Sequence, residues 1–311
     1  MKLLDWLLSG DITINQLVKR DLLEESIDFL DEGLINEFLV RFDPDKQMWG
    51  GGIYGPKWIS TTYTLLDLMY LGVSRTNEYV QQGARHAIVS LWPHPGPYKN
   101  KRYLDMCIAG MLVTIASYAN VEEIKLHELI DYILSHAFPD GGWNCCFDSM
   151  YHTPKSSSLH TTINVLEGLY QYERFGNTYR MNEIKTQVDN AKEFILKKRL
   201  FRSVRTGEVI HPDMSEIHFP YRWKYDCFRA LEYFARTNSP YDERMNEAME
   251  RLRTKLNTHP MPKGNPISGL THFQLETTRY SRFNTYRACY ILKKYDSRYY
   301  QEVLLKDYSI K

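Results

Sequence analysis

The stretch Leu159-His-Thr-Thr-Ile-Asn-Val-Leu-Glu-Gly-Leu169 opens with polar residues and continues with small and apolar ones. The same pattern returns at residues 58–68, 223–233 and 283–292, in a degenerate form at 103–112, and again near the N-terminus at 12–23. Successive copies begin roughly 45 to 65 residues apart, which is the length of a helical hairpin with a loop. The pattern therefore predicts six short inner helices, one in each of six repeats.

A second kind of helical segment alternates with the first, at residues 25–42, 77–92, 122–137, 181–200 and 241–257. These segments carry charged residues on one side and apolar residues on the other, as outer helices with one solvated face do. Stacking such hairpins buries the inner helices, and closing the stack into a ring removes its exposed ends. We therefore expect an all-α fold, an (α/α)6 toroid in which residues 1–311 form one domain. An open solenoid of the same hairpins is the alternative.

The composition is that of an ordinary globular protein, with 43% hydrophobic and 25% charged residues. A net charge of +1 and the lack of a Lys/Arg run predict that the protein does not bind nucleic acid. No stretch of about eighteen apolar residues occurs, so we expect no transmembrane segment. The start of the chain lacks the features of a signal peptide, and the five irregularly spaced cysteines fit reduced thiols. These features favour a cytoplasmic location.

A ring of hairpins also predicts where a ligand would bind. If each inner helix points its N-terminus to one face, the polar residues that open these helices converge there, and free backbone N–H groups favour acceptors or anions. We expect Thr61, Asp105, His160, Asp226 and Asn284 to meet at this mouth. The 23 tyrosines suit the wall of a partly wet cavity, although tyrosine is equally an ordinary core residue.

Loop and helix motifs resemble those of a known superfamily. Trp49-Gly-Gly-Gly52, Pro139-Asp-Gly-Gly-Trp-Asn144 and the Ser/His-Thr-Thr helix starts resemble the repeated Gly-Gly-Trp loop and Thr-bearing inner helix of the squalene cyclase and protein prenyltransferase toroids. The greatest similarity is to the short bacterial members described as prenyltransferase-like or squalene-cyclase-like. The resemblance implies a toroid whose central cavity accepts a polyprenyl or terpenoid chain.

Two activity-bearing motifs of that superfamily have no counterpart in this sequence. The cyclases use an Asp-x-Asp-Asp acid, whereas Asp43-Pro-Asp45 and Asp140 lack the paired aspartates. The prenyltransferases bind zinc through Asp-x-Cys and a later histidine, whereas Asp226 and Cys227 are adjacent and the later helix offers Asn284 and Arg287. The resemblance therefore implies neither the acid chemistry nor the zinc site.

Four residues are candidates for catalytic roles. Asp226 follows a cluster of His, Tyr, Arg and Trp and would act as a general base or cation partner, or else only cap its helix. His160 would transfer protons near neutral pH, or else serve as a hydrogen-bonded core or cap residue. His218 belongs to the cluster before Asp226, and Asp148 would join His160 or merely shape a turn.

Other residues are candidates for holding a ligand. Arg222 and Arg282 precede neighbouring inner helices and would suit a phosphate, diphosphate or carboxylate, with ion pairing to acidic neighbours as the structural alternative. Aromatic or polar residues at the other helix starts complete the predicted set, which is Trp58, Asp105, Trp143, Tyr221, Trp223 and Asn284. The tryptophans would stack on a ligand or simply fasten loop to helix. The spacing of His211, Glu216 and His218 matches no closed zinc pattern, and no nucleotide-binding loop occurs, so we expect neither a metal nor a cofactor.

Three functions remain open at this level. The first, which we favour, is an isoprenoid-handling protein with its ligand in an aromatic cavity, where aromatic faces would stabilise cations. The second is a carbohydrate-active lyase or hydrolase, for which Asp148 with Asp226 or Glu216 would be the pair of carboxylates. The third is a noncatalytic module that binds a small acidic ligand or a peptide.

Overall fold

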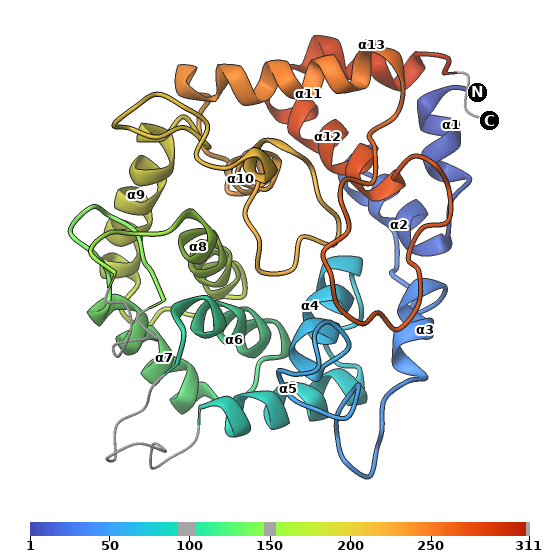
Figure 1. Cartoon of the computed structure of the whole chain (residues 1–311). Helices are drawn as coiled ribbons and strands as arrows, with labels where there is room; N and C mark the ends of the chain where they lie inside the picture. The colour runs from blue at the N-terminus through green and yellow to red at the C-terminus, as the bar shows by residue number, and fades with distance from the viewer. Residues whose placement is uncertain (93–103, 146–153, 309–311) are drawn as a thin grey trace.

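Two kinds of helix alternate along the chain in the computed structural model, which describes residues 1–92, 104–145 and 154–308 (Figure 1). The described residues form thirteen α-helices, two short 3-10 helices (Pro212–Ser215 and Glu243–Met245) and no β-strand, which confirms the predicted all-α class. The six expected inner helices are α2 (Ile12–Asp21), α4 (Thr61–Leu71), α6 (Met106–Ala119), α8 (Leu159–Arg174), α10 (Cys227–Arg236) and α12 (Arg282–Tyr295). The others are α1 (Leu3–Leu8), α3 (Leu34–Leu39), α5 (Glu78–Leu91), α7 (Glu123–Ser135), α9 (Met181–Lys197), α11 (Asn246–Thr258) and α13 (Ser297–Leu305).

Burial separates the two kinds as the sequence pattern indicates. Eleven of the fourteen residues of α6 are buried, whereas only Ile184, Ala191, Phe194 and Ile195 are buried among the seventeen residues of α9. A helix that is apolar all round must be covered on all sides, and an amphipathic one covers it. The inner helices therefore form the core of the molecule.

One predicted helix is much shorter than expected. Of residues 25–42 only Leu34–Leu39 are helical, because Gly33 precedes α3 with a φ of 58° that breaks the helix. The preceding segment instead runs extended beside α2, where the Gln16 side chain bonds both backbone groups of Leu30, at 2.7 and 3.2 Å. Helices α1 and α13 were not predicted, since neither exceeds nine residues.

The internal repeat is visible as one recurring hydrogen bond. The backbone N–H groups of Trp49, Trp143 and Met261 donate to the hydroxyls of Thr61, Thr162 and Thr285, at 3.0, 3.1 and 3.0 Å. In the first two copies the indole N–H also donates to a backbone carbonyl of the preceding outer helix, at 2.8 Å. The loops that end at Trp49, Trp143 and Met261 are therefore tied to the threonines of α4, α8 and α12 in the same way. Trp49 is therefore the structural counterpart of Trp143.

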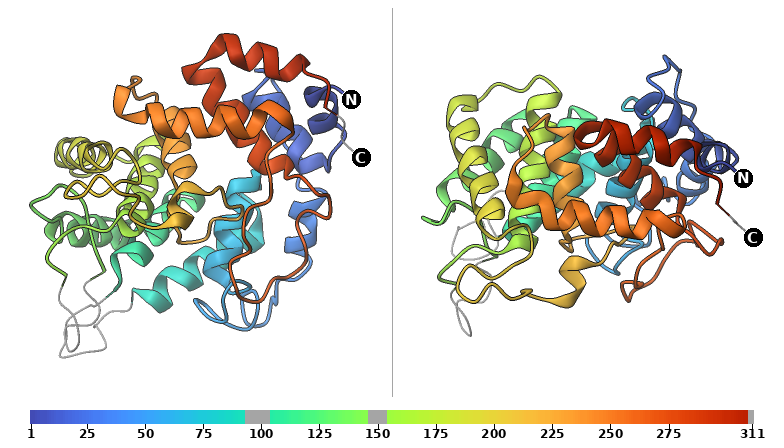
Figure 2. Two further views of the ribbon diagram at one scale, coloured as in Figure 1. Left: turned by 45° about the horizontal axis from the view of Figure 1, so that its top comes forward. Right: turned by 90° about the horizontal axis from the view of Figure 1, so that it is seen from above.

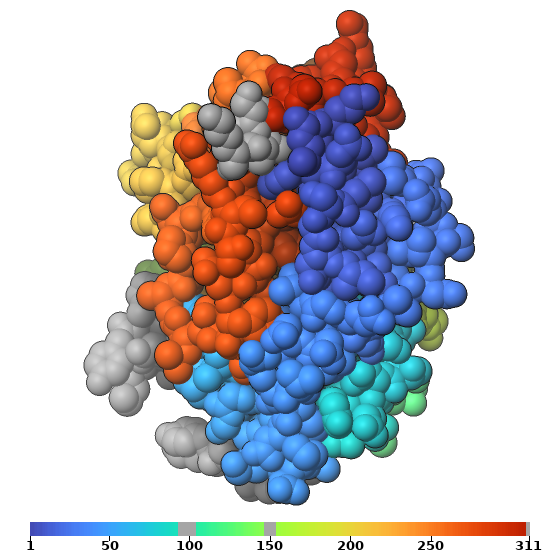
Figure 3. Space-filling view, turned by 90° about the vertical axis from the view of Figure 1, so that its right-hand side faces the viewer, coloured from blue at the N-terminus to red at the C-terminus, as the bar shows by residue number. Residues whose placement is uncertain are grey.

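The first and last helices lie side by side. Helix α1 contacts α13, and α12 contacts α2. The Leu3 N–H donates to the Lys306 carbonyl at 3.1 Å and the Tyr308 N–H to the Met1 carbonyl at 3.2 Å. Two further views show the same neighbourhood (Figure 2). The space-filling view shows the N-terminal helices packed against the segment that precedes α12 (Figure 3).

None of the helices in the described parts of the chain combines the length and the apolar character that a membrane span requires.

Candidate functional site

A cavity of about 340 Å³ lies between the inner helices, within the size range of small-molecule sites. Its walls come from α2, α4, α6, α8 and α10 and from the loop that precedes α10. Much of the lining is apolar or aromatic, and these side chains are Phe29, Tyr63, Leu66, Met69, Tyr70, Met111, Tyr118, Tyr170, Phe175, Phe219, Tyr221 and Tyr233. An apolar ligand body would therefore be desolvated along most of its length.

The charged lining is dominated by arginine. Six arginines face only three carboxylates around the cavity, and they are Arg20, Arg75, Arg174, Arg222, Arg229 and Arg236 against Asp67, Glu167 and Glu232. Each of the three carboxylates is already engaged, by Arg222, by Arg229 at 2.6 Å and by Arg236 at 2.8 Å, respectively. Arg20 is also paired, with Asp21 at 2.5 Å, so the positive excess of the cavity comes from Arg75 and Arg174.

Arg75 and Arg174 have no carboxylate partner among the residues that the structure describes, and both are exposed. The Arg75 Nε atom donates to the Tyr118 carbonyl at 2.7 Å, and its guanidinium lies 4.0 Å from the centre of the Phe175 ring. The Arg174 guanidinium lies 5.4 Å from the same ring. We call Arg75, Arg174 and Phe175 the arginine rim.

The arginine rim lies where inner helices end. Gly72, with a φ of 92°, terminates α4 shortly before Arg75, and Arg174 is the last residue of α8. Arg20 and Arg236 likewise occupy the last turns of α2 and α10, where basic residues are favoured by the helix dipole. The exposed part of the cavity lining is therefore at the C-terminal ends of the inner helices.

A buried ionic network ties α10, in the wall of the cavity, to α12. The Glu232 carboxylate accepts from Arg287 Nε at 2.6 Å and from Arg236 Nε at 2.8 Å. Arg287 is fully buried, and its Nη2 atom has no hydrogen-bond partner. Burial raises the pKa of Glu232, but attraction to the two arginines outweighs it, so the pKa lies below its usual value. Glu232 is therefore ionised at neutral pH.

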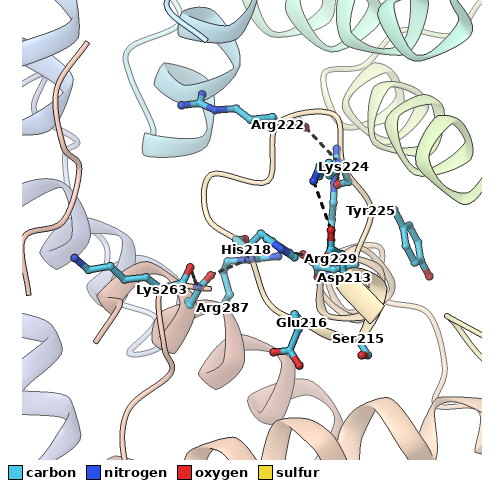
Figure 4. Close-up of polar contacts among 12 residues, drawn as sticks. Asp213, Ser215, Glu216, His218, Arg222, Lys224, Tyr225, Arg229, Lys263 and Arg287 are labelled. Atoms are coloured by element: carbon cyan, nitrogen blue, oxygen red, sulfur yellow. Dashed lines mark hydrogen bonds and ion pairs between the residues drawn. The ribbon is translucent and has the colours of Figure 1, made fainter. Parts of the chain in front are cut away.

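The loop before α10 also lines the cavity, and Figure 4 shows several of its side chains. Arg222 has a φ of 54° and extends towards α4, where it forms an ion pair with Asp67. The Tyr221 ring lies between two guanidinium groups, 4.1 Å from that of Arg229 and 5.0 Å from that of Arg287. Of the predicted ligand-binding residues, Tyr221 and Arg222 line the cavity.

Trp58 packs against this loop, and Trp223 belongs to it. The Trp58 indole N–H donates to the Ser268 carbonyl at 2.9 Å, and its ring lies 5.8 Å from the Arg222 guanidinium. Trp223 packs on a small cluster formed by Trp58, Tyr63 and Met111, and its ring meets the His160 ring edge to face. Both tryptophans therefore fasten loops to helices, and neither lines the cavity.

Asp226 and His218 form a buried pair outside the cavity. The Asp226 side chain caps α10 by accepting from the Arg229 N–H at 2.7 Å. The His218 Nδ1 atom lies 3.4 Å from the second Asp226 oxygen, and both side chains are nearly inaccessible. Glu216, the alternative to Asp226 as the carboxylate partner of Asp148 in glycan chemistry, instead pairs with Lys255 at 2.8 Å. The geometry of Asp226 corresponds to the capping alternative.

The remaining predicted residues are dispersed. Trp143 is fully buried in its repeat loop, and Asn284 bonds the Pro262 carbonyl at 2.9 Å. Arg282 lies away from Arg222, with its guanidinium 4.6 Å from the Trp6 ring. Asp105 precedes α6 with one carboxylate oxygen buried and unpartnered, and burial raises its pKa. Asp148 lies outside the described residues.

Three of the five residues expected at the mouth are therefore not free to bind a ligand there. Thr61, Asp226 and Asn284 are buried and use their polar atoms on neighbouring backbone groups. Such groups must be paired where water cannot reach them. The cavity is exposed at the opposite ends of the helices, where sequence reasoning did not place a site. Among the described residues, no group of three histidine, cysteine or acidic side chains could hold a metal ion.

His160 is held as a neutral acceptor. Its Nδ1 atom accepts from the Tyr225 N–H at 2.8 Å. Burial, followed by the positive charge of Arg229, lowers the pKa of His160 to about 4. The imidazole therefore stays neutral in the folded protein until the pH approaches 4.

We expect stability to decline as the pH falls from about 6.5 to 4, because the unfolded chain takes up the His160 proton in this window and the folded chain does not. The full loss attributable to His160 is about 3 kcal/mol. His160→Asn keeps an acceptor for the Tyr225 N–H and removes the titration. Urea unfolding at pH 7 and pH 4.5 should show a smaller difference for this variant. His272, whose pKa burial also lowers to about 4, should leave a residual slope. If the unfolding free energies of variant and parent depended equally on pH, the loss of stability could not be assigned to His160.

No protein-family model matches the chain, and no curated protein matches it.

Proposed function

We propose that the chain binds an isoprenoid-type ligand that carries an anionic group. The apolar chain of the ligand would occupy the cavity, and the anionic group would lie at the arginine rim. The observation that carries this proposal is the division of the cavity between an aromatic interior and two exposed arginines, Arg75 and Arg174, without carboxylate partners among the described residues. Guanidinium groups bind phosphate and carboxylate through paired hydrogen bonds, which suits this position.

We also propose that the hairpins close into an (α/α)6 toroid related to the squalene cyclases and protein prenyltransferases. Contacts of α12 with α2 and of α1 with α13 support ring closure. The bonds from Trp49 and Trp143 to Thr61 and Thr162 support a repeated Gly-Gly-Trp unit. The proposal concerns ligand binding in the cytoplasm and assigns no reaction, because the Asp-x-Asp-Asp acid and the Asp-x-Cys zinc motif have no counterparts.

Binding of farnesyl diphosphate and of farnesol, measured by calorimetry, tests this function. We expect the diphosphate to bind more tightly, and we expect Arg75→Gln and Arg174→Gln each to weaken its binding about tenfold, because each removes a charge-assisted hydrogen bond. Farnesol binding should change little in both variants. Arg298→Gln removes the same charge from an exposed position on α13 and should have no effect.

Two outcomes would contradict the proposal. Unchanged affinity for farnesyl diphosphate in the Arg75→Gln/Arg174→Gln double variant would show that the arginine rim does not bind the diphosphate. Binding of an acidic oligosaccharide without binding of either isoprenoid would assign the cavity to the alternative ligand class.

A further inference from the structure

Two cysteines from separate segments meet near the start of α6. The Sγ atoms of Cys107 and Cys145 lie 3.5 Å apart, and both side chains are partly exposed. Cys107 is the second residue of α6, and Cys145 follows the repeat loop at Trp143. By contrast, Cys227 and Cys289 are buried within α10 and α12. The first pair is therefore the accessible thiol pair of the described residues.

Both segments are held in place by hydrogen bonds. The Tyr132 hydroxyl donates to the Leu104 carbonyl at 2.8 Å, just before α6. On the other side, the Ser158 N–H donates to the Trp143 carbonyl at 2.8 Å and the Asn144 side chain bonds the Ser156 carbonyl at 2.8 Å. A disulfide needs an S–S distance of about 2.05 Å. The two sulfur atoms therefore have to approach by roughly 1.5 Å, a displacement on the scale of a side-chain rotation.

The two thiols differ in acidity. Hydrogen bonding between the pair lowers the pKa of Cys145 below its ordinary value, against the opposing effect of burial, and the Thr161 hydroxyl at 3.5 Å acts in the same direction as the pairing. The thiolate is the attacking species in disulfide exchange. Cys145 is thus the thiol that would react first.

We propose that Cys107 and Cys145 form a reversible intramolecular disulfide when the protein meets a small disulfide such as oxidised glutathione. The Cys145 thiolate attacks one sulfur of that disulfide, its S–S bond breaks, and one glutathione thiolate leaves. Cys107 then gives up its proton to solvent and attacks the Cys145 sulfur, which releases the second glutathione. Two protein thiols are oxidised and one small disulfide is reduced to two thiols.

The link would join two walls of the cavity region. Cys107 belongs to α6, which contributes Met111 and Thr114 to the cavity, and Cys145 contacts Thr161 of α8, which contributes Asn164 and Glu167. The bond would also enclose α7 in a covalent loop. We expect the oxidised protein to have a melting temperature about 5 °C higher than the reduced protein, because a closed loop limits the unfolded chain.

Alkylation and peptide mass spectrometry of the whole chain test this inference. After incubation with oxidised glutathione, we expect Cys107 and Cys145 to resist alkylation, to appear in one linked peptide, and to be freed by dithiothreitol. Cys107→Ser should instead accumulate a glutathione adduct at Cys145. Cys146→Ser, a matched change at the adjacent cysteine, should leave the 107–145 link intact.

The inference fails if all thiols of the folded protein remain alkylatable after oxidation. It also fails if the linked peptide joins Cys146 to either Cys107 or Cys145. Neither result depends on ligand binding in the cavity, so the test is independent of the proposed function.

Discussion

Replacing Glu232 with glutamine should lower the free energy of unfolding by about 3 kcal/mol, because removing one member of a buried ion pair leaves an uncompensated charge. Without the carboxylate, Arg287 would keep the His218 carbonyl at 2.7 Å and the Asn284 side-chain oxygen at 3.0 Å, which are both uncharged acceptors. Its Nη2 atom already lacks a partner. Urea-induced unfolding followed by circular dichroism measures the change.

The surface pair of Arg298 and Glu302 on α13 provides the control for Glu232→Gln. Its side chains are 91% and 57% exposed, and exposed ion pairs contribute at most about 1 kcal/mol. Glu302→Gln makes the same chemical change and should alter stability by less than about 0.5 kcal/mol. Equal effects of the two substitutions would show that the buried network does not hold α10 to α12.

Replacing Gly110 with alanine should destabilise the protein by about 3 kcal/mol through overpacking. Helices α6 and α8 cross at Gly110 and Gly168, where their backbones touch. A Cβ atom on Gly110 would lie 2.5 Å from the Asn164 carbonyl oxygen, and one on Gly168 would lie 2.4 Å from the Gly110 carbonyl oxygen. Because both obstacles are backbone atoms, the helices have to separate to admit the methyl group.

Thermal unfolding and urea titration of Gly110→Ala and Gly168→Ala measure this effect. Gly55→Ala is the matched control, since a Cβ atom there meets nothing within 4 Å and its φ is not in the left-handed region. Because α6 and α8 both line the cavity, the two helix variants should also bind ligand more weakly. Wild-type stability in both would mean that the helices do not approach closely at this crossing.

Much of the helical fold could be predicted from the sequence because the pattern repeats. The polar-then-apolar motif located α8 at its first residue, Leu159, and placed the other inner helices nearby. Helix starts were less well defined. Helix α4 begins at Thr61 rather than at Trp58, and α10 begins at Cys227 rather than at Trp223, because caps and loop contacts determine where a helix begins. A pattern of apolar residues does not encode those contacts.

The ligand site could not be predicted in the same way. Arg20, Arg174 and Arg236 lie in the last turns of their helices, and basic residues there are common whether or not a ligand is bound. Only the fold shows that these ends surround one cavity. Conversely, Asp226 and Asn284 are residue types that often occur in binding sites. In this structure their side chains instead form hydrogen bonds with buried backbone groups. Residue type and position at a helix start did not distinguish these two roles.

A crystal structure of the protein with farnesyl diphosphate would test the central claim most directly. We expect density for the farnesyl chain among the aromatic side chains between α4, α8 and α10, with the diphosphate oxygens within hydrogen-bond distance of Arg75 and Arg174. An empty cavity at saturating ligand, or a diphosphate bound at the opposite end beside Arg222, would contradict it.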